Sequence, residues 1–468
     1  MTDAEIAAEA ASAPPLRDDD GNIAPDFVAR VADLVRAGDA EALRALAADL
    51  HEADAADLLE ALERDLRAPF VELLGPAFDF ASLTELDETV RVALVDQLPT
   101  ETVVAGLRDL DSDDAVYILE DLDDARKAEI LGRLPAAVRV PLLRSLALPD
   151  ESAGRRMQSD FIAVPPFWTV GQLIDHLREA EELPDAFYSI FVVDPGFRLI
   201  GTVPLDKLLR AKRPTVVSDI LDEDLHPILA TEDQEEAART FERYNLVSAP
   251  VVDEGGRLLG VLTIDDVVDV IEEEADEDLK ALGGIVGDEE LSDTFAYAAR
   301  SRIPWLLVNT GTAFLAASVI GLFEGSIEKI VALAVLMPIV ASMGGNAGTQ
   351  AMTVTVRAIA TRELGIHNAR RVLLREILVG FFNGVVIALF VGGSAALWFW
   401  SPELGVIIAT ALVVNMLVAG TFGVVIPLTL ERLGIDPAVA SAVFLTTVTD
   451  VVGFCAFLGL ATWWYGLW

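Results

Sequence analysis

The hydrophobic pattern of this chain changes near residue 300. Before that point apolar residues are interspersed with charged ones, and after it they run in long stretches. An α-helix needs about 20 apolar residues to cross a bilayer. Five stretches meet this length, at 303–323, 329–356, 373–399, 404–430 and 438–466. The pattern therefore predicts a soluble part followed by a membrane domain of five α-helices, which we place at 300–468.

A leucine repeat occupies the first part of the chain. Leucine recurs every twelve residues from Leu50 to Leu146, and Asp or Pro often follows it. Asp and Pro are common at helix starts, so each unit is expected to be one short helix and a turn. Such units bury their leucines only by stacking on one another. We predict an all-α superhelical repeat domain at 26–150, preceded by a disordered tail at 1–25.

A strand–turn–strand–helix unit then occurs twice between residues 151 and 271. The strands SIFVV and APVV, each followed by a turn and a second strand, lead into the helices LDKLLR and IDDVVDVIEEE. This α/β duplication resembles a tandem of CBS domains, which implies an adenine nucleotide, with ATP as a candidate regulator. Tyr188 and Asp266 are the candidate nucleotide contacts. Pro204 and Lys207 depart from the module's pattern in the first copy, so binding there stays an open question.

An acidic helical segment at 272–299 links the duplicated part to the first span. Gly283-Gly284 marks a bend or an end within it. The sequence thus predicts a multidomain chain with a connecting helix before the membrane domain.

Charge is divided unevenly along the chain. Up to Arg300 there are 26 basic and 67 acidic residues, and beyond it there are eight of each. A surface this acidic argues against nucleic acid as a partner, because phosphate binding needs Lys and Arg. It suits cations, although five lysines in all also fit an acid-rich surface adapted to a salty cytoplasm. A single cysteine, Cys455, excludes an internal disulfide framework,.

Basic residues between the spans predict the orientation. The segment after the second span carries Arg357, Arg362, Arg370, Arg371 and Arg375, whereas 324–328 and 400–403 carry no Lys or Arg. The positive-inside rule places the arginine-rich loop in the cytoplasm. We expect a multi-pass plasma-membrane protein with a cytoplasmic N-terminus, no signal peptide and a C-terminus outside.

Asp450 lies inside the fifth apolar stretch, one helical turn after Thr446. A carboxylate in a membrane is costly and usually marks an ion pathway. Carboxylate and hydroxyl oxygens are the hard ligands that suit Mg²⁺. The glycine-rich second span adds the amide of Asn346. The alternative for Asp450 is a protonated side chain bonded to a neighbouring helix. No phosphate-binding loop or HExxH motif occurs, so we expect no enzyme activity,.

The second-span sequence PIVASMGGNAGTQAMTVTVRAIATREL and the later TTVTD resemble the MgtE family of magnesium channels or transporters. The resemblance implies a homodimer whose second and fifth spans line one pore, and a connecting helix that acts as a plug. It also implies Mg²⁺ ligands on the pore, the plug and the soluble domains. Together with the membrane residues above, these candidate metal ligands are Asp450, Thr446, Asn346, Asp109, Asp113, Asp265, Glu273, Asp276, Glu277 and Asp436.

The predicted function is a Mg²⁺-selective channel that imports Mg²⁺ down the membrane potential. Mg²⁺ bound between the acidic cytoplasmic domains would relieve their repulsion and close it. A secondary divalent-cation transporter coupled to H⁺ or Na⁺ is the alternative, because one buried acid per chain allows either. A membrane-tethered nucleotide sensor without transport is a third hypothesis.

Overall fold

The computed structural model describes residues 14–47, 50–180, 183–184, 186–285, 289, 294–365 and 367–467. The chain divides into two compact units, residues 1–274 and 275–468, which are described separately. The predicted tail at 1–25 falls largely outside the described residues. Within it, Ala24 N–H donates to Leu16 O at 2.9 Å, and Arg17 pairs with Asp57 at 2.8 Å. Ordered structure therefore begins before the predicted domain start at residue 26.

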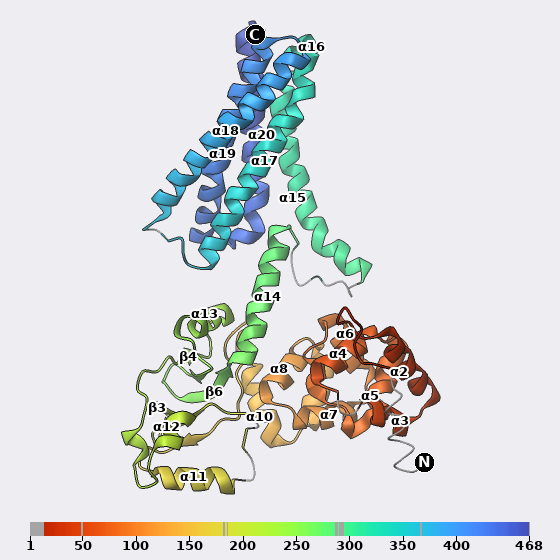
Figure 1. Ribbon diagram of the computed structural model, residues 1–468, viewed down its shortest axis with the longest axis vertical. Helices are drawn as coiled ribbons and strands as arrows, with labels where there is room; N and C mark the ends of the chain where they lie inside the picture. The colour runs from red at the N-terminus through yellow and green to blue at the C-terminus, as the bar shows by residue number, and fades with distance from the viewer. Residues whose placement is uncertain are drawn as a thin grey trace. The chain divides into compact units, whose positions relative to one another are not determined.

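The first part of unit 1 is built of short helices (Figure 1). They are α2 (Pro25–Ala37), α3 (Ala40–Ala47), α4 (Glu52–Ala61), α5 (Arg64–Leu74), α6 (Glu88–Gln97), α7 (Thr100–Asp109), α8 (Ser112–Glu120), α9 (Asp124–Arg133) and α10 (Ala136–Ser145). Two 3₁₀ turns, Gly75–Ala77 and Phe80–Leu83, separate α5 from α6. The predicted all-α domain is confirmed.

The twelve-residue period has a simple structural cause. Helices such as α6, α7, α9 and α10 are 10 residues long. Leu98 and Leu134 stand at helix C-caps with extended backbone and are buried in the common core. In such units the residue after the leucine then caps the next helix, as Pro99 and Pro135 do. The repeated leucine thus turns the chain and at the same time fills the core.

The second part of unit 1 contains the two predicted α/β copies. The first has β1 (Ala163–Val164), α11 (Val170–Glu179), β2 (Ser189–Val193), β3 (Leu199–Pro204) and α12 (Leu205–Arg210). The second has β4 (Ile228–Leu229), α13 (Gln234–Tyr244), β5 (Ser248–Val252), β6 (Leu258–Thr263) and α14 (Ile264–Leu282). The sheets have the orders β1-β2-β3 and β4-β5-β6, with the first pair parallel and the second antiparallel.

Duplication extends to the details of the turns. Asp194 Oδ1 accepts the N–H of Gly196 at 2.7 Å, and Asp253 Oδ1 accepts that of Gly255 at 2.8 Å. The two turns also bond to each other, since Leu199 N–H donates to Gly256 O at 3.1 Å. The two copies are therefore joined through their hairpins.

Helix α14 ends at Leu282, in agreement with the glycine pair that follows. Gly284 has φ +78°, and a Cβ there would lie 2.2 Å from Trp305 Cδ1. Only glycine fits this turn, because the left-handed conformation and the close ring both exclude a side chain. The rest of the predicted connecting helix, at 286–288 and 290–293, lies outside the described residues, and a new helix begins at Phe295.

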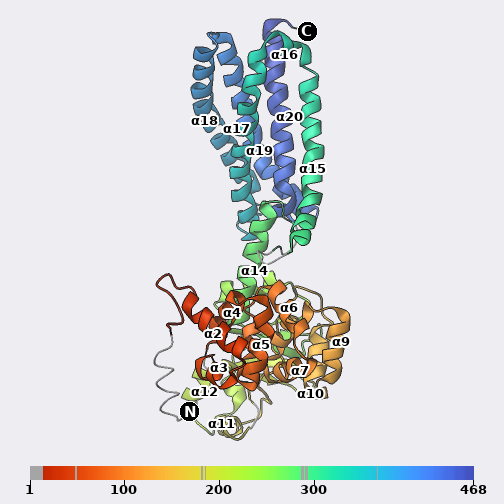
Figure 2. The same cartoon turned by 90° about the vertical axis from the view of Figure 1, so that its right-hand side faces the viewer.

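Unit 2 contains five helices long and apolar enough to cross a membrane. They are α15 (Phe295–Gly321), α17 (Val331–Ala360), α18 (Ala369–Trp398), α19 (Pro402–Arg432) and α20 (Pro437–Tyr465). The predicted five-helix domain is confirmed, and the expected turn at 324–328 is a short helix, α16 (Glu324–Lys329). These five helices run side by side in both views (Figures 1 and 2). Helix α19 is the most buried and packs on α17, α18 and α20.

Candidate functional site

The carboxylate of Asp450 lies on α20 beside hydroxyl groups whose protons are already in use. Thr446 Oγ1 donates to Ala442 O at 2.9 Å, and Thr447 Oγ1 donates to Val443 O at 2.6 Å. A hydroxyl that donates to its own helix keeps its oxygen lone pairs free to meet a cation. This part of α20 therefore presents oxygen acceptors.

Asp450 itself is partly exposed. Among the described residues the structure shows no hydrogen-bond donor and no cationic partner for its carboxylate. The alternative of an Asp bonded to a neighbouring helix thus finds no such contact within the described chain. An intramembrane acid without a structural partner is available to a passing ion.

Helix α17 has one packed face and one polar face. Gly344 and Gly348 are buried, and a Cβ at Gly348 would lie 3.0 Å from the Leu445 side chain of α20. The other face of α17 carries five polar residues at helical spacing, and all five are exposed in the single chain. They are Ser342, Asn346, Thr349, Gln350 and Thr353, and we call them the α17 polar stripe.

Polar groups facing lipid are costly, so such a stripe calls for water or protein against it. Asn346 belongs to the stripe, whereas the packed face points to α19 and α20. In the described chain no hydrogen bond links Asn346 to Asp450. In the single chain, Asp450 and the α17 polar stripe therefore do not form a closed set of ligands.

In unit 1, carboxylates of the N-terminal domain meet those of α14. Asp113 on α8 is buried, and burial, followed by the charge of Asp266, raises its pKa well above the ordinary value. Burial, assisted by neighbouring acids, also raises the pKa of Asp114 to about 7. Burial is also the main cause that raises the pKa of Asp266 to about 7. Like charges have been brought together out of water, and each one favours a proton or a cation nearby.

This interface contains acids that the sequence did not single out. Asp269 lies one turn after Asp265 on α14, and burial followed by Glu85 and Glu273 raises its pKa to about 6. Asp269 could have been found from the sequence, because its spacing of four residues places it on the same helical face as Asp265. Glu85 comes from the N-terminal domain, which the local pattern could not connect to α14.

The remaining predicted ligands occupy different places. In unit 1, Asp109 is exposed and pairs with Arg108 at 3.3 Å, and Glu273 pairs with Arg156 at 2.6 Å. In unit 2, Asp276 pairs with Lys280 at 2.7 Å, Asp436 caps α20 by accepting Ala438 N–H at 2.8 Å, and Glu277 lies on α14. Over the described residues, no three His, Cys, Asp or Glu side chains are arranged to hold a metal. The predicted ligand sets stay predictions.

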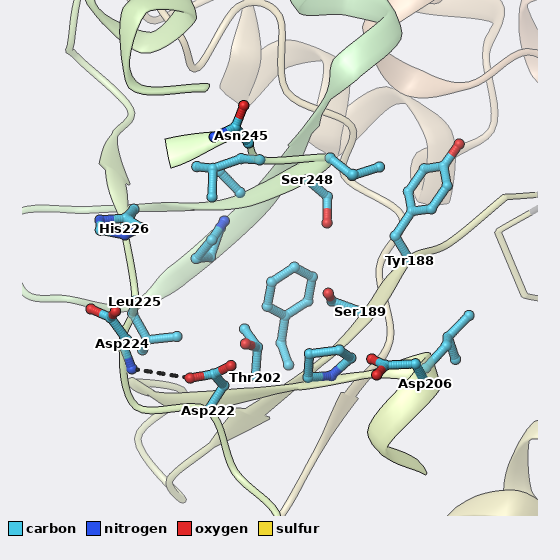
Figure 3. Close-up of a pocket in the computed structure, with 17 residues that line it drawn as sticks. Tyr188, Ser189, Thr202, Asp206, Asp222, Asp224, Leu225, His226, Asn245 and Ser248 are labelled. Atoms are coloured by element: carbon cyan, nitrogen blue, oxygen red, sulfur yellow. Dashed lines mark hydrogen bonds between the residues drawn. The ribbon is translucent and has the colours of Figure 1, made fainter. Parts of the chain in front are cut away.

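A cavity of about 460 Å³ lies between the two α/β copies (Figure 3). Tyr188 lines it, whereas Asp266 lies elsewhere and accepts a hydrogen bond from the Thr263 hydroxyl at 2.6 Å, and both nucleotide contacts stay predictions. Its polar lining includes Asp206, Asp222, Asp224, His226 and Asn245. Lys207 does not line it and pairs with Asp222 at 3.0 Å. Its acidic lining disfavours free phosphate groups,.

Comparison with known proteins gives consistent matches along the chain. The family model MgtE, a divalent cation transporter, matches residues 337–460. The MgtE intracellular N domain matches 50–151, and the CBS domain matches 153–213 and 217–273. The predicted tandem of CBS domains is thereby confirmed.

Relatives named magnesium transporter MgtE cover most of the chain. The protein of Thermus thermophilus is 34% identical over 350 residues, which are 74% of this chain and 78% of that protein. The protein of Bacillus subtilis is 28% identical over 93% of this chain and 97% of its own length. A solved structure, the cytosolic domain of the Mg²⁺ channel MgtE in complex with ATP, covers 52% of this chain and 99% of its own, with 29% identity and a TM-score of 0.49.

Proposed function

Because the chain belongs to the MgtE family of magnesium transporters, we propose that it is a Mg²⁺-selective channel importing Mg²⁺ down the membrane potential. The observation that carries the proposal is the Asp450 carboxylate, which lies within α20 without a donor or cation among the described residues. A fixed negative charge there lowers the cost of bringing a divalent cation into the bilayer. A potential of about 100 mV supplies roughly 4.6 kcal/mol per divalent ion, so no coupled ion or ATP hydrolysis is required.

The pore is proposed to form between two copies of the chain. The exposed α17 polar stripe supports this, since a second copy would turn it from lipid towards a shared axis. Helix α15 is also almost wholly exposed in the single chain. A homodimer with Asp450 from each copy near the axis would give a hydrated Mg²⁺ two carboxylates, and this ion keeps several waters in most sites.

Closure is proposed to follow from cytoplasmic Mg²⁺. The acids of α8 and α14 repel one another when they face each other without a cation, as the raised pKa values of Asp114 and Asp266 indicate. A divalent ion favours the docked arrangement only by its higher affinity for that state. When cytoplasmic Mg²⁺ falls, the N-terminal domain would separate from α14 and the connecting helix would release the pore.

Orientation and regulators complete the proposal. The arginines at 357–375 favour a cytoplasmic N-terminus, which with five spans leaves the C-terminus outside the plasma membrane,. ATP is proposed as a regulator at the cavity lined by Tyr188. Because Asp206 and Asp224 repel phosphates, ATP would enter as its Mg²⁺ complex, so binding should weaken when Mg²⁺ is chelated,.

The test is Mg²⁺ flux into proteoliposomes with the bath and lumenal Mg²⁺ varied separately. Asp450→Asn should reduce flux by about tenfold or more, since a change of 1.4 kcal/mol in the barrier is already tenfold. Glu403→Gln, which removes an exposed acid at the start of α19, is the matched control and should leave flux unchanged. Unchanged flux in Asp450→Asn would refute the pathway. Dependence on a pH or Na⁺ gradient would instead favour the secondary transporter.

A further inference from the structure

We propose that Arg156 is a built-in cation that helps to dock the N-terminal domain on the CBS pair, and so sets how much Mg²⁺ closure requires. This inference rests on the closure by cytoplasmic Mg²⁺ proposed above. It concerns a residue of unit 1 that pairs with Glu273 at 2.6 Å and lies outside the membrane helices. Arg156 acts through the position of other groups, and is therefore a positioning residue.

The backbone around Arg156 belongs to the CBS pair. Gln158 exchanges both backbone hydrogen bonds with Val261 of β6, at 2.8 and 2.9 Å. The guanidinium is held on the same side, because its Nη2 donates to Glu273 at 2.6 Å and its Nε donates to Gln234 Oε1 at 3.1 Å. These contacts lie wholly within the CBS pair and α14, so they persist when the N-terminal domain moves away.

One further contact of Arg156 reaches the N-terminal domain. Its guanidinium carbon lies 4.9 Å from the ring centroid of Tyr117 on α8. The ring is fixed from within its own domain by Arg91, at 4.3 Å, and Arg91 in turn pairs with Asp121 at 2.5 Å. The guanidinium and the ring attract each other through the ring's quadrupole. This attraction exists only while the two domains are docked.

The charge of Arg156 also changes what the N-terminal acids meet. Glu120 is half-buried on α8, where Arg155 pairs with it at 3.4 Å and the charges of Arg156 and Glu273 also act on it. Glu273 is already paired with Arg156. Helix α8 therefore faces an ion pair without net charge there, rather than an unpaired carboxylate. A tethered cation cannot dissociate, so this part of the docking persists without Mg²⁺. Asp113 and Asp266 would then be the acids whose repulsion a dissociable ion such as Mg²⁺ relieves.

The experiment measures docking directly in the full-length protein in lipid nanodiscs. Amide hydrogen exchange of α8 is followed while Mg²⁺ is titrated, and the Mg²⁺ concentration at half protection is recorded. Arg156→Gln should raise this midpoint by about threefold to tenfold, the range expected for a partly shielded cation–π contact. Arg213→Gln removes the same charge from an exposed pair with Asp175 and should leave the midpoint unchanged.

A second substitution separates the contact from general damage. Tyr117→Leu keeps an apolar side chain but removes the ring, and in that background Arg156→Gln should shift the midpoint much less than it does alone. Arg156→Lys, which keeps the charge, should restore part of the wild-type midpoint. Equal shifts in both backgrounds, or no shift at all, would overturn the inference while leaving Mg²⁺ closure intact. A wild type whose α8 gains no protection from Mg²⁺ would overturn both.

Discussion

Asn415 shows how a single polar residue can set the spacing of three membrane helices. It is fully buried on α19, and its Nδ2 donates to Val340 O of α17 at 2.9 Å. A Cβ at Gly344 of α17 would lie 2.2 Å from this nitrogen, and one at Gly453 of α20 would lie 2.7 Å from it. The amide thus fills space that two glycines leave open.

We expect Gly344→Ala to destabilise unit 2 by about 1–3 kcal/mol, the usual cost of forcing an extra methyl into a packed interior. Adding Asn415→Ala should recover part of the loss, because the shorter side chain makes room for the methyl. Thermal unfolding in detergent measures both variants, with Gly311→Ala, where nothing lies within 4 Å, as the control. A double variant less stable than Gly344→Ala alone would contradict this packing.

For single residues, the sequence predicted which side chains are candidate ligands better than it predicted which side chains pair with each other. Asp450 and Thr446 could be placed on one helical face, because an interval of four residues fixes that geometry. The pairing of Glu273 with Arg156 could not be predicted, since 117 residues separate them and only tertiary folding brings them together. The packing role of Asn415 could not be predicted either, because a single amide in an apolar helix belongs to no sequence pattern.

Among the elements, α18 and α19 approach most closely along a seam of glycines. A Cβ at Gly392 would lie 2.8 Å from Gly405 O, and one at Gly405 would lie 2.6 Å from Gly392 O. Membrane helices associate largely through such close packing, because lipid provides little hydrophobic drive between them. The seam therefore holds α18 against the rest of unit 2.

A pair of adjacent glycines on α18 tests this seam. Gly392→Ala should separate the helices and lower the stability of unit 2 by about 1–3 kcal/mol. Gly393→Ala makes the same change of composition at a position where nothing lies within 4 Å, and should have little effect or raise stability slightly,. Thermal unfolding in the same detergent compares them, and equal losses would show that helix propensity rather than packing was measured.

Most elements followed from local pattern. The leucine period predicted the short helices because a leucine of the period can both end a helix and enter the core, as Leu98 and Leu134 do. The five spans followed from length and hydropathy alone. The helix α16 was missed, since its six residues are too few and too polar to show helical periodicity.

For the whole molecule, the decisive feature is that acidic residues of the N-terminal domain lie close to acidic residues of α14. Asp114 and Glu85 of the N-terminal domain lie near acids of α14, which composition alone would present as a solvated surface. Sequence predicted an acidic protein with cation sites, but the facing of α8 and α14 depends on how two domains dock. This arrangement makes the pH dependence of docking predictable.

The α8–α14 interface should tighten as the pH falls when Mg²⁺ is removed with EDTA. The pKa of Asp114 and that of Asp266 are each about 7 when docked, against an ordinary value of 3.8. Docking therefore takes up protons, its stabilising contribution is complete below about pH 4, and it is lost as the pH rises through 7. Between pH 8 and pH 6 the docking equilibrium should rise by at most about tenfold for each carboxylate, because Asp111 and Glu52 still act on Asp114 when the domains separate, and by less for groups that titrate together,.

Hydrogen exchange of α8, corrected for the intrinsic pH dependence of exchange, measures this effect in the full-length protein. The groups that face the pair from both domains are Glu52, Asp111, Asp113, Asp265 and Asp269, with Glu85, Glu273 and Arg156 beside Asp269. Asp114→Asn should flatten the response, and saturating Mg²⁺ should do the same in the wild type because the ion replaces the proton. Tighter docking at higher pH would contradict the repulsion on which the proposed Mg²⁺ closure depends.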